Sequence, residues 1–166
     1  MDQSAFYGVV SAINFTLLGL WWVAAKDWVD LVAGAASARR TAYLVSLQFV
    51  IPGTVSLLAQ VAPDVPLVWR TAFAIAGAVG AVGVLMLASE LRRVSGARVT
   101  PALFVVAGVP LYLAVAVVAA VPALSTAFPG GFTPIQIEAL LLTLLVFLGT
   151  QEAWVVRLPP ASQVTA

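Results

Sequence analysis

Apolar and polar positions divide the chain into five long apolar runs, separated by short segments rich in proline, glycine or charge. The runs cover about residues 5–25, 42–61, 71–89, 102–124 and 135–156. A helix needs about 20 mostly apolar residues to cross the hydrocarbon core of a bilayer. The pattern therefore predicts an all-α, polytopic integral membrane protein, a bundle of five transmembrane helices that forms one domain over residues 1–157. We expect residues 158–166, which contain a double proline near their start, to form a flexible C-terminal tail.

The composition agrees with this class and narrows the possible chemistry. The chain is 62% hydrophobic and only 9% charged, whereas soluble domains carry about 25% charged residues. Its mean hydropathy is +1.06. The absence of cysteine and histidine excludes disulfides, thiolate nucleophiles, histidine bases, and haem or zinc held by these residues.

The basic residues predict an orientation in the membrane. Seven of the eight fall on one side of a five-helix topology, and Arg70 alone falls on the other. The seven are Lys26, Arg39, Arg40, Arg92, Arg93, Arg98 and Arg157. By the positive-inside rule, the N-terminus lies outside and the C-terminus is cytoplasmic. We expect a multi-pass protein of the cell membrane, specifically the bacterial cytoplasmic membrane.

Two polar stripes are expected to meet near the middle of the bilayer. Asn14 lies at the centre of the first run, and Gln48, Pro52, Ser56 and Gln60 recur every four residues in the second. These side chains could line a hydrated pathway or a small-molecule site. Alternatively, Asn14 and Gln48 could form a structural hydrogen bond between adjacent helices.

The fifth run contains two carboxylates, Glu138 and Glu152. Their spacing of 14 residues places them on one helix face, about 21 Å apart. We expect both to point into the bundle or an aqueous vestibule, because a carboxylate facing lipid is costly. Arg70 is the expected ion-pair partner of Glu138. Glu152 could be reached by any one of Arg39, Arg40, Arg92 or Arg93.

The residues between these glutamates, Leu142, Leu145 and Gly149, leave an apolar gap on the same face. A continuous proton wire along this helix alone is therefore not expected. Any pathway would have to include Asn14 and Gln48 at its centre.

Three glycines, Gly77, Gly80 and Gly83, recur in the third run and predict close helix packing. This packing could form an oligomer interface or lie within one protomer. Between the first two runs, residues 26–41 could form a short interfacial helix or an irregular loop. The five tryptophans fall at the ends of the predicted spans, as in the aromatic belt of membrane proteins.

No catalytic motif, metal-ligand cluster or cofactor motif is present in the sequence, and a net charge of +1 does not favour nucleic acid. The leading hypothesis is a small membrane channel or transporter protomer, a homo-oligomer that moves an ion or small solute. The alternative is a non-catalytic accessory or scaffold subunit that binds other membrane subunits. A lipid-modifying enzyme is the least supported, because the chain lacks a dense interfacial cluster of charges. The lipid bilayer is the expected environment in each case.

Overall fold

The structure, a computed structural model, describes residues 3–61, 64–95, 99–127 and 130–157. Five long helices are present: α1 (Gln3–Ala25), α3 (Ala36–Val61), α4 (Pro66–Ser95), α5 (Val99–Ala120) and α6 (Pro134–Arg157). Two short elements complete the order, α2 (Val29–Val32) and the 3₁₀ helix η1 (Pro122–Ala127). Each long helix has the length and apolar character to cross a membrane. The predicted all-helical class with five such helices is therefore confirmed. The predicted tail, residues 158–166, lies outside the described residues.

The N-terminal bounds of two helices differ from the predicted spans. α3 begins at Ala36, six residues before the expected start, because Arg39 and Arg40 continue the helix beyond its apolar part. Arginine is a good helix former and can keep its charged head in a polar environment. α4 likewise begins early, with Pro66 at its first position, where a proline costs no helical hydrogen bond.

The predicted end of the fourth span at residue 124 is wrong, because α5 ends at Ala120. Pro122 has no N–H to donate and disfavours helical geometry in the residue before it. The chain instead continues as η1 from Pro122. A cap for the open end of α5 is described below.

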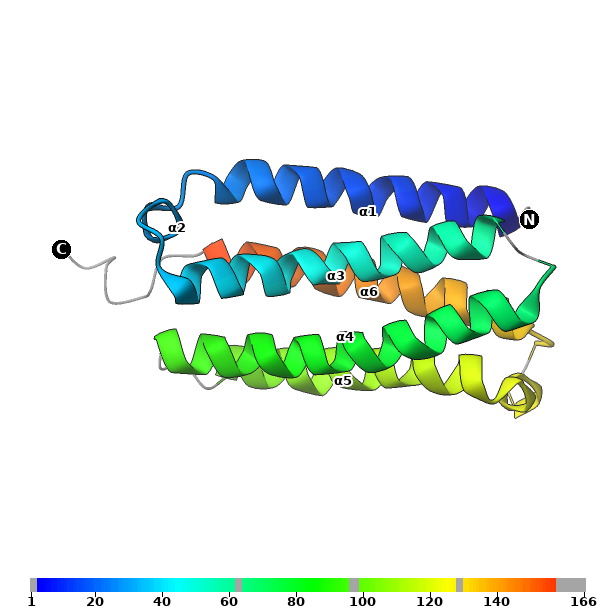
Figure 1. Cartoon of the computed structure of the whole chain (residues 1–166). Helices are drawn as coiled ribbons and strands as arrows, with labels where there is room; N and C mark the ends of the chain where they lie inside the picture. The colour runs from blue at the N-terminus through cyan, green and yellow to red at the C-terminus, as the bar shows by residue number, and fades with distance from the viewer. Residues whose placement is uncertain (1–2, 62–63, 96–98, 128–129, 158–166) are drawn as a thin grey trace.

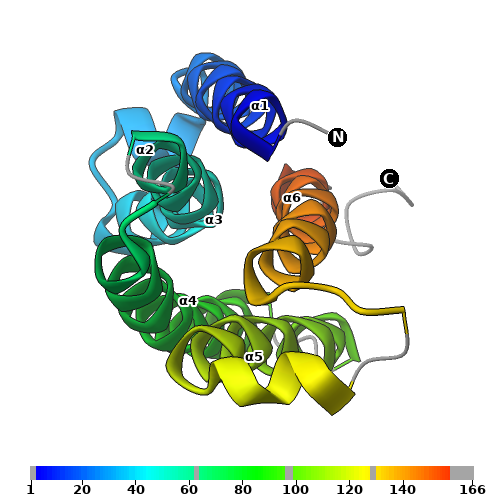
Figure 2. The same cartoon turned by 90° about the vertical axis from the view of Figure 1, so that its right-hand side faces the viewer.

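The helices form an arc that is closed by its last member. Figure 1 shows the five long helices side by side, running along a common axis. Viewed along that axis, α1, α3, α4 and α5 follow one another around the arc, and α6 lies on its concave side (Figure 2). α6 contacts α5, α3 and α1. One face of α6 is thus enclosed by helices that precede it in the chain.

The basic residues are distributed unequally between the two ends of the bundle. We call the end that carries α2 the basic end (Figure 1). It carries Lys26, Arg39, Arg40, Arg92, Arg93 and Arg157. The opposite end, at the start of α1, α4 and α6, carries Arg70. Arg98 lies outside the described residues.

Two of the tryptophans belong to the core rather than to a belt facing lipid. Trp21 and Trp69 are 5% and 6% exposed. The indole Nε1 of Trp21 donates a hydrogen bond to the carbonyl of Ala42, at 3.0 Å, and its ring packs edge to face against Trp28. These contacts attach the end of α1 and the following connection to α3. The connection itself contains the short helix α2, in the segment where the sequence allowed an interfacial helix.

Candidate functional site

The inward face of α6 carries the two glutamates of the candidate pathway. Glu138 and Glu152 are fully buried, each with 0% of the residue exposed. The outward face is apolar and exposed, with Leu140, Leu144, Phe147 and Trp154. In lipid an apolar face can turn outward, whereas a carboxylate there would be costly. The orientation of α6 therefore follows from its charged residues rather than from its apolar ones.

An apolar stretch separates the two glutamates on this face. Leu142 and Leu145 are almost fully buried in the core, and Gly149 is buried beyond them. At 1.5 Å per residue, the two glutamates lie about 21 Å apart along α6. The buried face of α6 thus carries two distinct polar clusters, one toward each end of the bundle.

The first of these, the Glu138 cluster, consists of Glu138, Tyr7 and the carbonyl of Ile135. The hydroxyl of Tyr7 donates to the Ile135 carbonyl, at 2.6 Å, one helical turn before Glu138. Tyr7 is also close enough to Glu138 for an electrostatic interaction. Its ring packs edge to face against Phe73 of α4. Neither carboxyl oxygen of Glu138 accepts a hydrogen bond from any residue that the structure describes.

The second, the Glu152 cluster, consists of Glu152, Gln48 and Tyr112. The Tyr112 hydroxyl of α5 donates to Gln48 Oε1 of α3, at 2.8 Å. A Cβ built on Gly149 would lie 3.3 Å from Gln48 Cβ, so α3 and α6 are in close contact there. Glu152 lies one turn further along and is close enough to Tyr112 for an electrostatic interaction. Gln48 Nε2 and both oxygens of Glu152 have no hydrogen-bond partner in the described chain.

The direct hydrogen bond between Asn14 and Gln48 that the sequence allowed is not formed. Asn14 donates from Nδ2 to the carbonyl of Val10 in its own helix, at 2.8 Å. Its Oδ1 is buried and accepts no hydrogen bond from a described residue. Asn14 instead packs against Gly53, whose Cβ would lie 3.1 Å from Asn14 Cβ. The two midplane amides thus each retain one unsatisfied polar atom.

The rest of the polar stripe on α3 divides among different neighbours. Ser56 is buried and donates to the carbonyl of Pro52, at 2.7 Å. Gln60 lies against α1, because a Cβ on Gly8 would be 2.8 Å from its Nε2. Pro52 itself offers no N–H to the carbonyl of Gln48, four residues earlier. The stripe therefore does not form one continuous polar lining.

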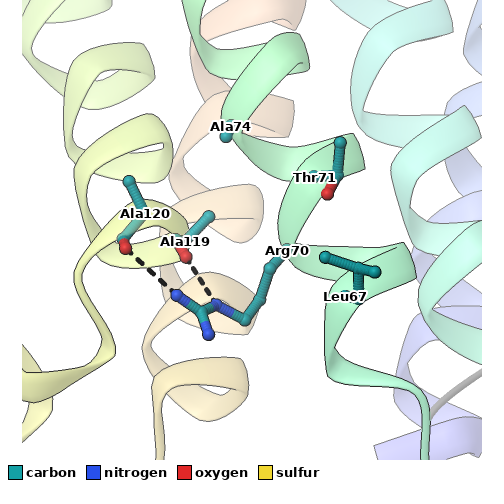
Figure 3. A pocket seen from close by; sticks show the side chains of 6 residues that line it. All are labelled: Leu67, Arg70, Thr71, Ala74, Ala119 and Ala120. Carbon is teal, nitrogen blue, oxygen red and sulfur yellow. Dashed lines mark hydrogen bonds between the residues drawn. The ribbon is translucent and has the colours of Figure 1, made fainter.

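Arg70 does not pair with Glu138, which corrects the sequence-based expectation. Its Nε donates to the carbonyl of Ala119 at 2.8 Å, and its Nη2 to that of Ala120 at 3.0 Å (Figure 3). The last carbonyls of a helix lack intrahelical donors, and Pro122 prevents α5 from continuing. The guanidinium therefore caps α5. It borders a cavity of about 220 Å³ lined by Leu67, Arg70, Thr71, Ala74, Ala119 and Ala120.

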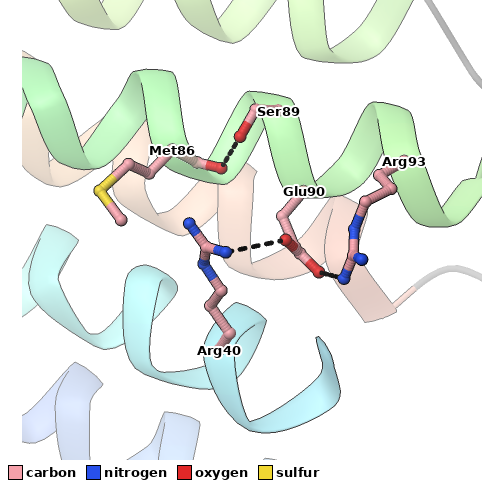
Figure 4. Close-up of polar contacts among 5 residues, drawn as sticks. All are labelled: Arg40, Met86, Ser89, Glu90 and Arg93. Atoms are coloured by element: carbon pink, nitrogen blue, oxygen red, sulfur yellow. Dashed lines mark hydrogen bonds and ion pairs between the residues drawn. The ribbon is translucent and has the colours of Figure 1, made fainter. Parts of the chain in front are cut away.

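Two of the four arginines expected near Glu152, Arg40 and Arg93, contact Glu90 instead (Figure 4). The other two, Arg39 and Arg92, are exposed. Arg93 Nη2 lies 2.7 Å from Glu90 Oε1, and Arg40 Nη1 lies 3.7 Å from Glu90 Oε2. Arg93 is one turn after Glu90 on α4, a spacing that favours a local pair. The side chain of Glu90 is buried, whereas those of Arg40 and Arg93 are 50% and 68% exposed. It joins α3 to α4 at the basic end.

The predicted packing glycines have neighbours within the protomer. A Cβ on Gly77 would lie 2.5 Å from the Tyr112 carbonyl, and one on Gly80 would overlap the Tyr112 ring. Gly83 faces Gln48, with 3.8 Å between its built Cβ and Nε2. The glycines thus let α5 approach α4 and let Tyr112 reach Gln48.

The sequence-based selection of site residues missed Tyr112, and it did not include the burial of Glu90. Tyr112 is the single polar side chain between Pro101 and Ala120. That isolation was a usable signal, because a buried hydroxyl in an apolar helix needs a partner. Glu90 had no comparable signal, since its burial depends on how α3 packs against α4.

Among the described residues, no group of three or more acidic side chains is placed to hold a metal ion. Comparisons of the chain with known protein families, curated proteins and solved structures found no match. The arrangement of side chains is therefore the basis for a functional proposal.

Proposed function

We propose that this chain is a protomer of a small membrane channel or transporter that moves an ion or small solute past the inward face of α6. The observation that carries the proposal is the burial of Glu138 and Glu152 without a hydrogen bond or ion pair to any described residue. Ionisable side chains within a membrane are costly and typically mark the path of an ion, proton or substrate.

Glu90 supports this interpretation because it shows how the same fold treats a structural carboxylate. Glu90 is also buried, with 2% of the residue exposed against 0% for the other two, but it contacts both Arg40 and Arg93. Such pairing is the usual condition of a buried charge that stabilises packing. Glu138 and Glu152 lack it, so a role in packing does not account for them.

The residues between the two clusters favour a transporter over an open pore. Leu142 and Leu145 close the buried face of α6 between the glutamates. Asn14 and Gln48, each with an unsatisfied polar atom, lie on the neighbouring helices at intermediate depth. An apolar barrier between two polar sites suits a pathway that opens toward one end at a time.

The membrane and the assembly are parts of the same proposal. The concentration of basic residues at one end favours a cytoplasmic basic end, with the start of α1 outside. We propose a homo-oligomer in the bacterial cytoplasmic membrane. The mass of the purified protein in lipid nanodiscs tests the assembly, and a strictly monomeric particle would contradict it.

Reconstitution into sealed vesicles tests transport. We expect the wild-type chain to mediate flux of at least one ion or solute under a pH, voltage or concentration gradient. Glu138→Gln and Glu152→Gln should each lower that flux, whereas Asp64→Asn, at an exposed carboxylate, should not. If no flux occurs under any gradient and the protein co-purifies with another membrane protein, it is instead an accessory subunit.

A further inference from the structure

We infer that Glu138 and Glu152 are proton-binding sites, and that the proton is the ion exchanged along the pathway. This inference rests on the proposed transport function and specifies its ion. It follows from asking which positive charge can neutralise each carboxylate in the arrangement described above.

Among the side chains that the structure describes, no basic group supplies that charge. The elements packed against α6 are α1, α3, α5 and the short η1, and their titratable residues are few. η1 contains none. α1 contains Tyr7, α5 contains Tyr112, and α3 contains Arg39, Arg40 and Tyr43. The side chains of Arg39 and Tyr43 are exposed, and Arg40 pairs with Glu90.

α4, the remaining helix of the arc, has no cation free for either glutamate. Arg70 is held by two carbonyls of α5, and Arg93 is held by Glu90. Arg92 is exposed. Among the described side chains, each glutamate therefore faces one tyrosine and no basic residue.

The space around the carboxyl groups excludes larger cations. Both residues are 0% exposed, so no water-sized space opens beside their oxygens. A metal cation needs several oxygen ligands around it, and no cluster of acidic side chains is placed to supply them within the described chain. A proton needs no additional volume. It is thus the one cation that can neutralise these groups in the closed arrangement.

The position of the two sites defines how the exchange would proceed. When one end of the bundle opens, its carboxyl group loses a proton to water and becomes a carboxylate. Rebinding of a proton reverses this step and allows that end to close. Leu142 and Leu145 prevent direct transfer between the two sites, so the exchange requires alternate opening of the two ends.

Infrared spectroscopy of the protein in lipid bilayers tests proton binding without reference to transport. At neutral pH we expect the wild type to show the carbonyl band of protonated carboxylic acids. Each of Glu138→Gln and Glu152→Gln should lose part of that band. Asp64→Asn, at an exposed side chain, should leave that band unchanged. If a glutamine variant fails to fold, titration of the wild-type band to high pH provides the same information. Loss of ionised signal in both glutamine variants would overturn the inference.

Flux measurements in the sealed vesicles used to test transport distinguish a failure of this inference from a failure of the proposed function. We expect an imposed pH gradient to drive proton movement that falls to the rate of protein-free vesicles in either glutamine variant. Solute flux that is independent of pH and of both carboxyl groups would overturn this inference and leave the proposed function standing. Absence of every flux would overturn the proposed function itself.

Discussion

At the scale of single residues, Gly80 decides whether Tyr112 can reach across α4 to Gln48. The Tyr112 ring occupies the space that a Cβ on Gly80 would need. Gly80→Ala should therefore lower the free energy of unfolding by about 1–3 kcal/mol, the usual cost of overpacking. Thermal unfolding in detergent micelles measures the effect.

Gly19 offers a matched control for this substitution. It lies within another long helix, α1, and nothing occupies the space within 4 Å of its built Cβ. Gly19→Ala should be neutral or stabilise the protein by up to about 1 kcal/mol through helix propensity. Equal destabilisation by both substitutions would show that the Tyr112 contact does not limit the space at Gly80.

The sequence allowed the inward orientation of Glu138 and Glu152 to be predicted, but not their partners. Orientation follows from helical periodicity and the cost of exposing charge to lipid, both of which are local. The partner of an arginine depends on which acceptors compete for its guanidinium in the folded structure. Arg70 had two α5 carbonyls available as alternatives to Glu138, and those carbonyls became available only because α5 ends early.

At the scale of elements, Arg70 acts as the cap of α5. Arg70→Met removes both donors to the Ala119 and Ala120 carbonyls while keeping much of the apolar stem. We expect the free energy of unfolding to fall by about 1–3 kcal/mol, because hydrogen bonds to charged groups contribute that much. Amide hydrogen exchange should become faster at the end of α5 and in η1.

Arg92→Met is the control for this change, because Arg92 is an exposed arginine near the other end of α4. It should leave exchange in α5 and η1 unchanged. If amide exchange in the Arg70→Met variant were identical to that of the wild type, η1 and the surrounding packing would hold the end of α5 without the guanidinium.

Helix number was predictable from the sequence, whereas helix bounds were less so. Five apolar runs of spanning length required five helices, since backbone groups in lipid must be satisfied within the segment. The helix bounds depended on individual residues whose effect on helix ends does not follow from the hydropathy pattern. Arg39 and Arg40 extended α3, and Pro122 shortened α5.

At the scale of the whole molecule, orientation in the membrane can be tested directly because the chain has no cysteine. Ala33 is exposed at the basic end, and Thr126 is exposed at the opposite end. We expect a membrane-impermeant maleimide to label Thr126→Cys in intact cells and to label Ala33→Cys only after lysis. The reverse pattern would place the basic end outside.

The enclosed position of α6 also affects how the bundle is synthesised. α6 follows in the chain every helix that it packs against, so the arc leaves the ribosome before the helix that fills it. If the chain enters the membrane during synthesis, the concave surface with Gln48 and Tyr112 stays uncovered by protein until α6 follows. A chain truncated before Pro134 would therefore become a target for membrane quality-control proteases.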